Sequence, residues 1–300
     1  MAYTWDIDEK ESVELPEFMS YVEEYGNPED EDSFIDCRVM LRRLANNRKF
    51  VLDRYHDNLR LYAASGEQAL SQTQSIELSK AGKFYLRANI WLPIDESSLT
   101  SFYQKKLFSY DLPHDHNFSF LTVGYFGEGY ETDIYSYDFR SAVGYHNERV
   151  AMDFLGRHKL SPGRLMFYRG GRDIHIQYCP ETLSVSLNLM PNIKHVPEEQ
   201  QYIFDCNAKS IVGGAGDLIS NKLFLFKAAG FIGDDSTVEL LGDIAKSEKS
   251  CPKTRAMALR SVEQIDHAAS EHIKRSVPMK VIELYQRDLV CGSKGRDYMA

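Results

Sequence analysis

Apolar and polar positions alternate with a period of two through the middle of the chain, from about residue 82 to residue 191. The clearest example has apolar side chains at every second position: Phe84, Leu86, Ala88, Ile90 and Leu92. This period is typical of β-strands, whose successive side chains point to opposite faces. Further strand-like runs occupy 117–126, 130–138, 164–169, 174–179 and 183–190. Short strands separated by Gly, Pro and Asp turns predict an antiparallel sandwich or barrel.

On both sides of this segment the apolar spacing lengthens to that of an α-helix. Before it, Phe34, Cys37, Leu41 and Leu44 recur at helical spacing, with Asp32 or Ser33 as the candidate N-cap. After it, helices are predicted over 217–229, 236–247, 253–265 and 267–287, with Ser236 and Glu239 at capping-box spacing. The chain is therefore predicted to be an α+β protein with an N-terminal helical region (1–80), a barrel (81–195) and a C-terminal helical region (196–300).

Charge and composition narrow the classes of partner. The 300 residues carry a formal net charge of -9, which argues against a nucleic-acid-binding surface rich in Lys and Arg. No apolar run reaches the length of about 18 residues that would predict a membrane span. The five cysteines form no CxxC pair, and the first residues lack the features of a secretory signal. A cytoplasmic protein that binds neither nucleic acid nor membrane is expected.

The tripeptide His114-Asp115-His116 is the first candidate for chemistry. In a strand, residues i and i+2 point to the same face, so His114 and His116 could grip one metal ion while Asp115 points away. Such a pair alone is a weak signal. A third candidate ligand, His175, follows a Pro-Gly turn at 162–163, a strand at 165–168 and a Gly-Gly turn at 170–171.

Taken together, these two histidine segments resemble the two motifs of the cupin family. The first motif is similar to His114-Asp-His116 followed by a strand and the turn Gly127-Glu-Gly129, and the second to 160–175. The resemblance covers about 82–191 and implies an antiparallel cupin barrel, or double-stranded β-helix. It also implies that His114, His116 and His175 lie on neighbouring strands and bind one divalent metal.

One departure from the family pattern concerns the fourth ligand. Most cupins have a glutamate five residues after the second histidine, where this chain has Leu121. The three remaining histidines are similar to the set in thiol dioxygenases, and His-Asp-His with the preceding Gly82-Lys-Phe resembles cysteine dioxygenase. The cysteine of that enzyme at the Leu121 position is absent, and so is the tyrosine expected within 184–190. A thiol substrate is therefore not implied.

Further site residues follow from the same resemblance. Tyr125 shares strand parity with Leu121 and could donate a hydrogen bond to bound dioxygen or substrate, although strand propensity also explains it. Arg87 or Arg172 could bind a substrate carboxylate, the alternative being a solvated surface arginine. Glu131 or Asp133 could supply a fourth ligand if their side of the strand faces the lumen. Glu131 is otherwise expected near the substrate or on the hairpin surface.

The function that these features imply is a mononuclear non-heme iron(II) dioxygenase acting on a small chelating, amino-acid-like or other organic substrate. Imidazole also suits zinc, nickel and copper, so the ligand type does not select the metal. Two alternatives stay open at this point. One is a zinc- or nickel-dependent isomerase or hydrolase, and the other is a non-catalytic ligand sensor. In either case the C-terminal helices could bind a protein or peptide partner.

Overall fold

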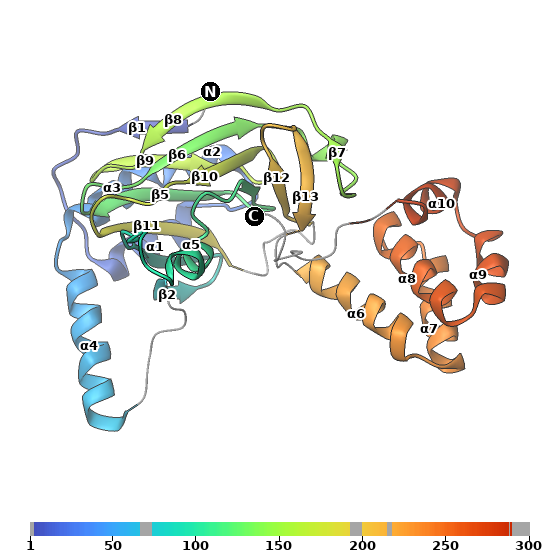
Figure 1. The fold of residues 1–300 in the computed structure, drawn as a ribbon. Coiled ribbons are helices and arrows are strands. Elements are labelled where there is room, and N and C mark those ends of the chain that lie inside the picture. Colours follow the sequence, from blue (N-terminus) through green and yellow to red (C-terminus); the bar gives the residue numbers. More distant parts are fainter. Residues whose placement is uncertain (1–2, 67–73, 193–199, 215–217, 288, 290–300) are drawn as a thin grey trace. The chain divides into compact units, whose positions relative to one another are not determined.

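The computed structural model describes residues 3–66, 74–192, 200–214, 218–287 and 289 (Figure 1). They belong to two compact units. The first contains described residues from 1–136 and 153–197, and the second contains those from 137–152 and 198–300. The N-terminal helices thus share a unit with most of the predicted barrel. The boundary predicted near residue 195 lies outside the described residues.

The first unit contains two antiparallel sheets. One sheet has the order β1-β9-β5-β11-β3-β2, and the strands β4, β10, β6 and β8 pair in that order in the other. In chain order the strands are β1 (Tyr3–Asp6), β2 (Ser75–Ala81), β3 (Phe84–Trp91), β4 (His114–Asp115), β5 (Phe120–Phe126), β6 (Glu131–Ser136), β8 (Asp153–Lys159), β9 (Arg164–Tyr168), β10 (Asp173–Gln177) and β11 (Ser184–Pro191).

Side chains from both sheets pack together between them. Phe120 and Tyr168 of the first sheet belong to one buried cluster with Ile134 of the second. The neighbouring strands are distant in sequence, as in the pairing of β11 with both β3 and β5. This double sheet, flanked by helical regions, confirms the predicted α+β cupin fold.

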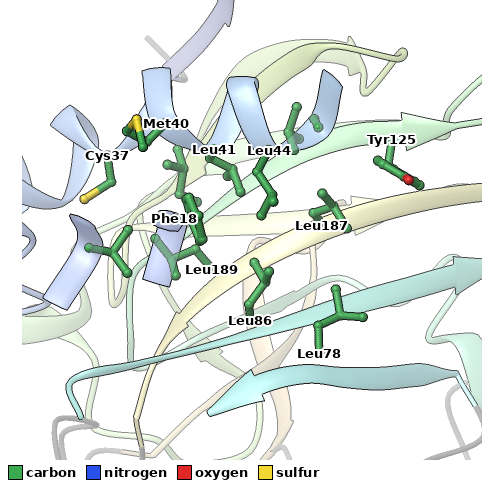
Figure 2. Packing of buried hydrophobic residues seen from close by; sticks show 14 of the residues in the cluster. Phe18, Cys37, Met40, Leu41, Leu44, Leu78, Leu86, Tyr125, Leu187 and Leu189 are labelled. Carbon is green, nitrogen blue, oxygen red and sulfur yellow. The ribbon is translucent and has the colours of Figure 1, made fainter. Parts of the chain in front are cut away.

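The outer face of the first sheet is covered by N-terminal helices. The helices of this unit are α1 (Leu15–Tyr25), α2 (Glu31–Asp36), α3 (Arg38–Asn46), α4 (Phe50–Ser65) and α5 (Ser101–Phe108). Figure 2 shows Leu41 and Leu44 of α3 packed against Leu187 and Leu189 of β11. Since alternate strand residues face opposite sides, this apolar packing leaves the intervening residues for the barrel interior. Asn188, for example, points inward.

Local signals explain where these helices begin and end. Pro16 stands in the first turn of α1, where its missing N–H costs no hydrogen bond. The N-cap of α2 is Asp30, whose side chain accepts hydrogen bonds from the backbone of Asp32 and Ser33, so neither of those two residues is the cap. Gly66 ends α4 in the left-handed conformation, with φ 72°.

The second unit combines a small sheet with a helical bundle. Its elements are η1 (Phe139–Ser141), β7 (Glu148–Arg149), β12 (Tyr202–Asp205), β13 (Ser210–Gly214), α6 (Leu218–Ile232), α7 (Asp235–Lys246), α8 (Pro252–Ile265), α9 (His267–Lys274) and α10 (Met279–Tyr285). The central helix is α8, whose Ala256, Leu259 and Val262 are fully buried. Within the described part of the chain, no helix is both long and apolar enough to cross a membrane.

Several sequence predictions for this unit were wrong in detail. The helix predicted over 267–287 is divided into α9 and α10, because Pro278 has no N–H for a helical hydrogen bond and restricts the residue before it. Asp234 and Thr237, not Ser236 and Glu239, form the capping box of α7. The strands β12 and β13 lie within the range 196–300, which the sequence predicted to be a helical region.

The packing of α3 on β11 yields a test of the fold. Leu187 is fully buried beneath the N-terminal helices, so Leu187→Ala is expected to lower the free energy of unfolding by about 2–5 kcal/mol. Leu99, which is 99% exposed, is the matched control. Leu99→Ala is expected to change the free energy of unfolding by less than about 0.5 kcal/mol. Urea denaturation measures both, and equal effects would contradict the described core.

Candidate metal centre

The three predicted histidines meet on the inner face of the second sheet. His175 of β10 lies directly opposite His114 of β4 in the antiparallel register, so their side chains point the same way. The ring centroids of His114 and His175 are 4.3 Å apart, and His116 lies 5.1 Å from His114 and 5.0 Å from His175. One nitrogen from each ring lies within 4.8 Å of the others. Two β-strands and a tight loop thus bring together residues about 60 positions apart.

Hydrogen bonding prepares one imidazole for a metal and leaves another unsatisfied. The Nδ1 of His114 lies 2.9 Å from the carbonyl oxygen of Leu112. Because a carbonyl only accepts, this Nδ1 carries the proton and the Nε2 lone pair is free for a ligand bond. His175 is fully buried, and neither of its ring nitrogens has a hydrogen-bond partner among the described residues. A buried polar atom without a partner is costly, so these donors fit a bound ion.

Burial keeps two of these imidazoles neutral. It lowers the pKa of His114, and it lowers the pKa of His175 well below the usual value, with His114 and His116 adding to the effect. Neutral imidazole is the form that binds a metal. Aromatic rings surround the histidines: His116 stacks on Phe118 at 4.9 Å and lies 5.3 Å from Phe120, and Tyr168 lies 4.7 Å from His175. These rings make the surroundings of the histidines largely apolar.

The two candidate carboxylates lie on the other face of β6. In the register of β6 with β10, Ile134 lies opposite His175, so Asp133 points away from the histidines. Asp133 accepts hydrogen bonds from Arg157 at 2.6 and 2.9 Å and from the Tyr178 hydroxyl at 2.8 Å. Glu131 has the same parity and is half-exposed, 3.7 Å from Arg157. The prediction that Glu131 or Asp133 reaches the metal or its substrate is therefore wrong, because both side chains point to the face of β6 that is opposite to the histidines.

Strand parity also corrects the placement of Tyr125. Leu121 and Tyr125 do share a face of β5, but both belong to the buried cluster of the outer face, beneath the N-terminal helices. Figure 2 shows Tyr125 in this cluster. The Tyr125 hydroxyl donates a hydrogen bond to the carbonyl oxygen of Asn47 at 3.0 Å, and its ring packs on Phe50 at 5.6 Å. Phe120, the residue before Leu121, faces the histidines instead. The structure therefore does not bring Tyr125 to the metal centre.

The two candidate arginines have different surroundings. Arg172 lies in the turn before β10, is exposed, and approaches Glu31 of α2 at 3.4 Å. Arg87 lies on the inner face of β3, and its Nε is buried without a hydrogen-bond partner in the described chain. Desolvation lowers the pKa of Arg87. Of the two, only Arg87 faces the barrel interior.

The sequence did not identify several other residues that face the barrel interior. Tyr168 and Tyr130 face the interior, and burial raises the pKa of Tyr168 to about 12 and that of Tyr130 well above its usual value. His158 pairs with Thr132 on the inner side of β8. His146 belongs to the second unit, where its Nδ1 lies 3.3 Å from the carbonyl oxygen of Val212. Once the pairing of the strands is known, the residues that share the inner face with His175 can be identified by strand alternation. The sequence alone does not show which residues pair.

A second group of possible ligands lies in the helical unit. Glu263, His267 and Glu271 have ligand atoms within 4.8 Å of one another, but His267 and Glu271 are exposed. Lys274 pairs with Glu263 at 3.3 Å and with Glu271 at 2.6 Å, and it neutralises much of their charge. This is an ordinary surface ion-pair network.

Comparison with known proteins gives only distant likenesses. No family model and no curated protein matches the chain. Among solved structures, hydroquinone 1,2-dioxygenase from Sphingomonas sp. TTNP3 has 11% identity and a TM-score of 0.28, over 41% of this chain and 67% of that one. A cupin-2 domain protein from Shewanella frigidimarina has 8% identity and a TM-score of 0.24, over 46% and 92%. Salicylate 1,2-dioxygenase from Pseudaminobacter salicylatoxidans has 9% identity and a TM-score of 0.25, over 47% and 32%. These likenesses are too slight to carry an argument about activity.

The outward position of Asp133 generates a prediction. Asp133→Asn is expected to lower the free energy of unfolding by about 1–3 kcal/mol, because Arg157 loses a charge-assisted bond, and to leave metal content unchanged. Arg157 lowers the pKa of Asp133, so the carboxylate stabilises the fold above the unfolded pKa of about 3.9. The stability difference should therefore shrink as the pH falls through that region.

Denaturation at several pH values and elemental analysis measure these two effects. Glu131→Gln is the matched control, since the half-exposed Glu131 is expected to contribute at most about 1 kcal/mol. Loss of bound metal from the Asp133→Asn variant alone would show that Asp133 is a ligand after all.

Proposed function

We propose that this protein is a mononuclear non-heme iron(II) dioxygenase that acts on a small organic substrate. The observation that carries the proposal is the convergence of His114, His116 and His175, which no carboxylate joins among the residues that the structure describes. Glu131 and Asp133 point to the other face, and Asp173 is engaged by Arg169 at 2.5 Å. Three neutral imidazoles leave the charge of a divalent ion uncompensated by the protein.

This ligand set leaves room for both reactants. Three protein donors on a metal that prefers six leave three positions, which suit a chelating anionic substrate and dioxygen. Bound iron(II) would supply the redox chemistry, with both oxygen atoms entering the product and the substrate providing the electrons that reduce dioxygen. No separate reductant is then required. Zinc or nickel would support isomerisation or hydrolysis instead, and a non-catalytic sensor would bind its ligand without turnover.

The protein residues around the histidines have separate tasks. Phe118 stacks on His116 and Phe120 meets the same ring edge-on, so both would give the ligand positions an apolar wall. Tyr168 stacks on Phe120 at 4.6 Å and keeps its hydroxyl protonated, because burial raises its pKa. In the structure this hydroxyl donates to the weak acceptor Met166 Sδ at 3.8 Å, and beside His175 it could donate to a substrate oxygen instead. A more specific resemblance, to cysteine dioxygenase, is supported mainly by the His-Asp-His tripeptide.

Metal content and oxygen uptake test the proposal directly. After anaerobic reconstitution, the wild type is expected to bind one iron per chain and to consume oxygen with a carboxylic or amino-acid substrate. His175→Ala is expected to weaken iron binding beyond the roughly 10- to 100-fold that loss of an outer partner costs. His146→Ala, which changes a histidine of the second unit, is the matched control and should retain iron.

Two outcomes would replace this proposal. Bound zinc with turnover but no oxygen uptake on iron loading would indicate an isomerase or hydrolase. Ligand binding that needs His116, with no turnover on any metal, would indicate a sensor.

The same substitution is expected to affect the reaction at Tyr168 but only the stability of the fold at Tyr125. Tyr168→Phe is expected to lower kcat by about 10-fold or more, because one hydrogen bond to a reacting oxygen is lost. Tyr125→Phe removes only the bond to Asn47 and is expected to cost about 1 kcal/mol of stability with kcat unchanged. Steady-state oxygen uptake and urea denaturation distinguish them, and a larger kcat loss in Tyr125→Phe would return the catalytic role to that residue.

The predicted protein or peptide partner has support on α6. Four of its apolar side chains are more than 60% exposed: Phe224, Leu225, Phe231 and Ile232. Exposed apolar surface of this kind is typical of interaction sites. The identity of such a partner stays a prediction.

A further inference from the structure

The barrel interior contains a patch of hydrogen-bond donors on the sheet that does not carry the histidines. Arg87 of β3 and Asn188 of β11 lie directly opposite each other in the antiparallel register and point to the same inner face. Their Cβ atoms are therefore neighbours, roughly 5 Å apart. In the described chain neither side chain has a carboxylate partner. Glu77, opposite Arg87 on β2, is exposed and forms no ion pair with it.

A fixed network determines which end of the Asn188 amide is presented. The indole N–H of Trp91 donates to Ser186 Oγ at 3.0 Å, which leaves the Ser186 hydroxyl to donate its own hydrogen. That hydroxyl donates to Asn188 Oδ1 at 3.1 Å, and Thr122 donates to the same oxygen at 2.6 Å. The amide oxygen is thus engaged twice, and the Nδ2 hydrogens remain to be donated.

Arg87 adds a positive charge to these donors. Its Nε is buried without a partner, and the hydroxyl-bearing rings of Tyr85 and Tyr130 are the groups near its charge. The Nε of this guanidinium has no hydrogen-bond partner in the described chain, although the Arg87 side chain as a whole is only partly buried, and an unpaired polar atom inside a barrel is costly. Arg87 and Asn188 both present donors, and the guanidinium has the forked geometry that matches a carboxylate.

The patch and the histidines lie within the reach of one small molecule. Phe120 and Thr122 are successive inner residues of β5, so they lie roughly 7 Å apart along the strand. Phe120 contacts His116, whereas Thr122 bonds to Asn188 of the patch. Aromatic rings line this region, with Trp91 and Tyr130 at 4.4 Å and Phe120 stacked on Tyr168. Such walls suit a flat or apolar body between two polar ends.

We infer that Arg87 and Asn188 form a carboxylate-binding subsite, and that the substrate is a small aromatic or apolar carboxylic acid held between this subsite and the histidines. The identification of the acid as substrate rests on the proposed function. The anion site itself does not, because its donors are present without a metal. The acid anchors at Arg87 and Asn188, and its other end reaches the metal ligands.

Benzoate is a suitable probe, with benzamide as its uncharged analogue. In the metal-free full chain carrying Trp5→Phe, Trp91 is the remaining tryptophan and reports binding by its fluorescence. Benzoate is expected to change this emission saturably and to raise the unfolding temperature, whereas benzamide is not. Arg87→Met is expected to weaken benzoate binding by about 10-fold or more, through loss of a charge-assisted hydrogen-bond pair. Arg172→Met makes the same charge change at an exposed position and should bind like the wild type.

Two further variants keep the inference testable if Arg87→Met folds poorly. Arg87→Lys keeps the charge but not the fork, and is expected to bind benzoate more weakly than the wild type. Asn188→Asp places a carboxylate beside Arg87, and is expected to abolish benzoate binding while raising the unfolding temperature. No saturable benzoate binding by the wild type, or equal binding by the Arg87→Met and Arg172→Met variants, would overturn the inference. Neither result depends on iron, so failure of the dioxygenase proposal would be seen separately in oxygen uptake.

Discussion

The convergence of three imidazoles on one side of a double sheet, with His175 fully buried, is the constraint on which the site depends. A histidine that enters a barrel of aromatic rings loses its hydration, so its proton is disfavoured and its lone pairs remain. His114 compensates with a bond to the Leu112 carbonyl oxygen, but His175 has no partner in the described part of the chain. A divalent ion is the group that would satisfy such a set. No carboxylate joins this set among the described residues, so a bound divalent ion would keep its charge for an anionic ligand.

Along each strand of the first sheet, alternate side chains pack against the N-terminal helices and the others face the barrel interior. On β5, Leu121, Val123 and Tyr125 pack beneath the N-terminal helices, while Phe120 and Thr122 face the interior. The helices supply the apolar burial that stabilises the sheet on its outer side. The inner side is thereby free to carry polar groups that a single-layered core would not tolerate. This division explains why the N-terminal helices belong to the same compact unit as the barrel.

Unsatisfied polar groups inside the barrel have a cost that folding alone does not explain. Within the described residues, Arg87 Nε, Asn89 Oδ1 and Thr132 Oγ1 are buried without hydrogen-bond partners, and all three belong to inner-facing side chains. Buried polar atoms are normally paired, and exceptions concentrate where a ligand completes them. In this barrel they lie on both sheets, with the cationic side chain on one and the metal-ligand candidates on the other. A ligand with two polar ends would meet the unpaired groups of both sheets.

The sequence by itself determined the fold class and the histidines, because both depend on local patterns. A period of two gives strands, and His-Asp-His in a strand gives two ligands on one face. The Pro-Gly and Gly-Gly turns around residues 162–171 identified His175 by resemblance. Only the tertiary structure decided which face of each strand is the interior. A shift of one residue in parity exchanges Leu121 for Phe120 and turns Tyr125, Glu131 and Asp133 away from the site. That parity follows from pairing between strands far apart in the chain, such as Arg87 with Asn188, and from the helices that cover one face, and neither is encoded in any short stretch of sequence.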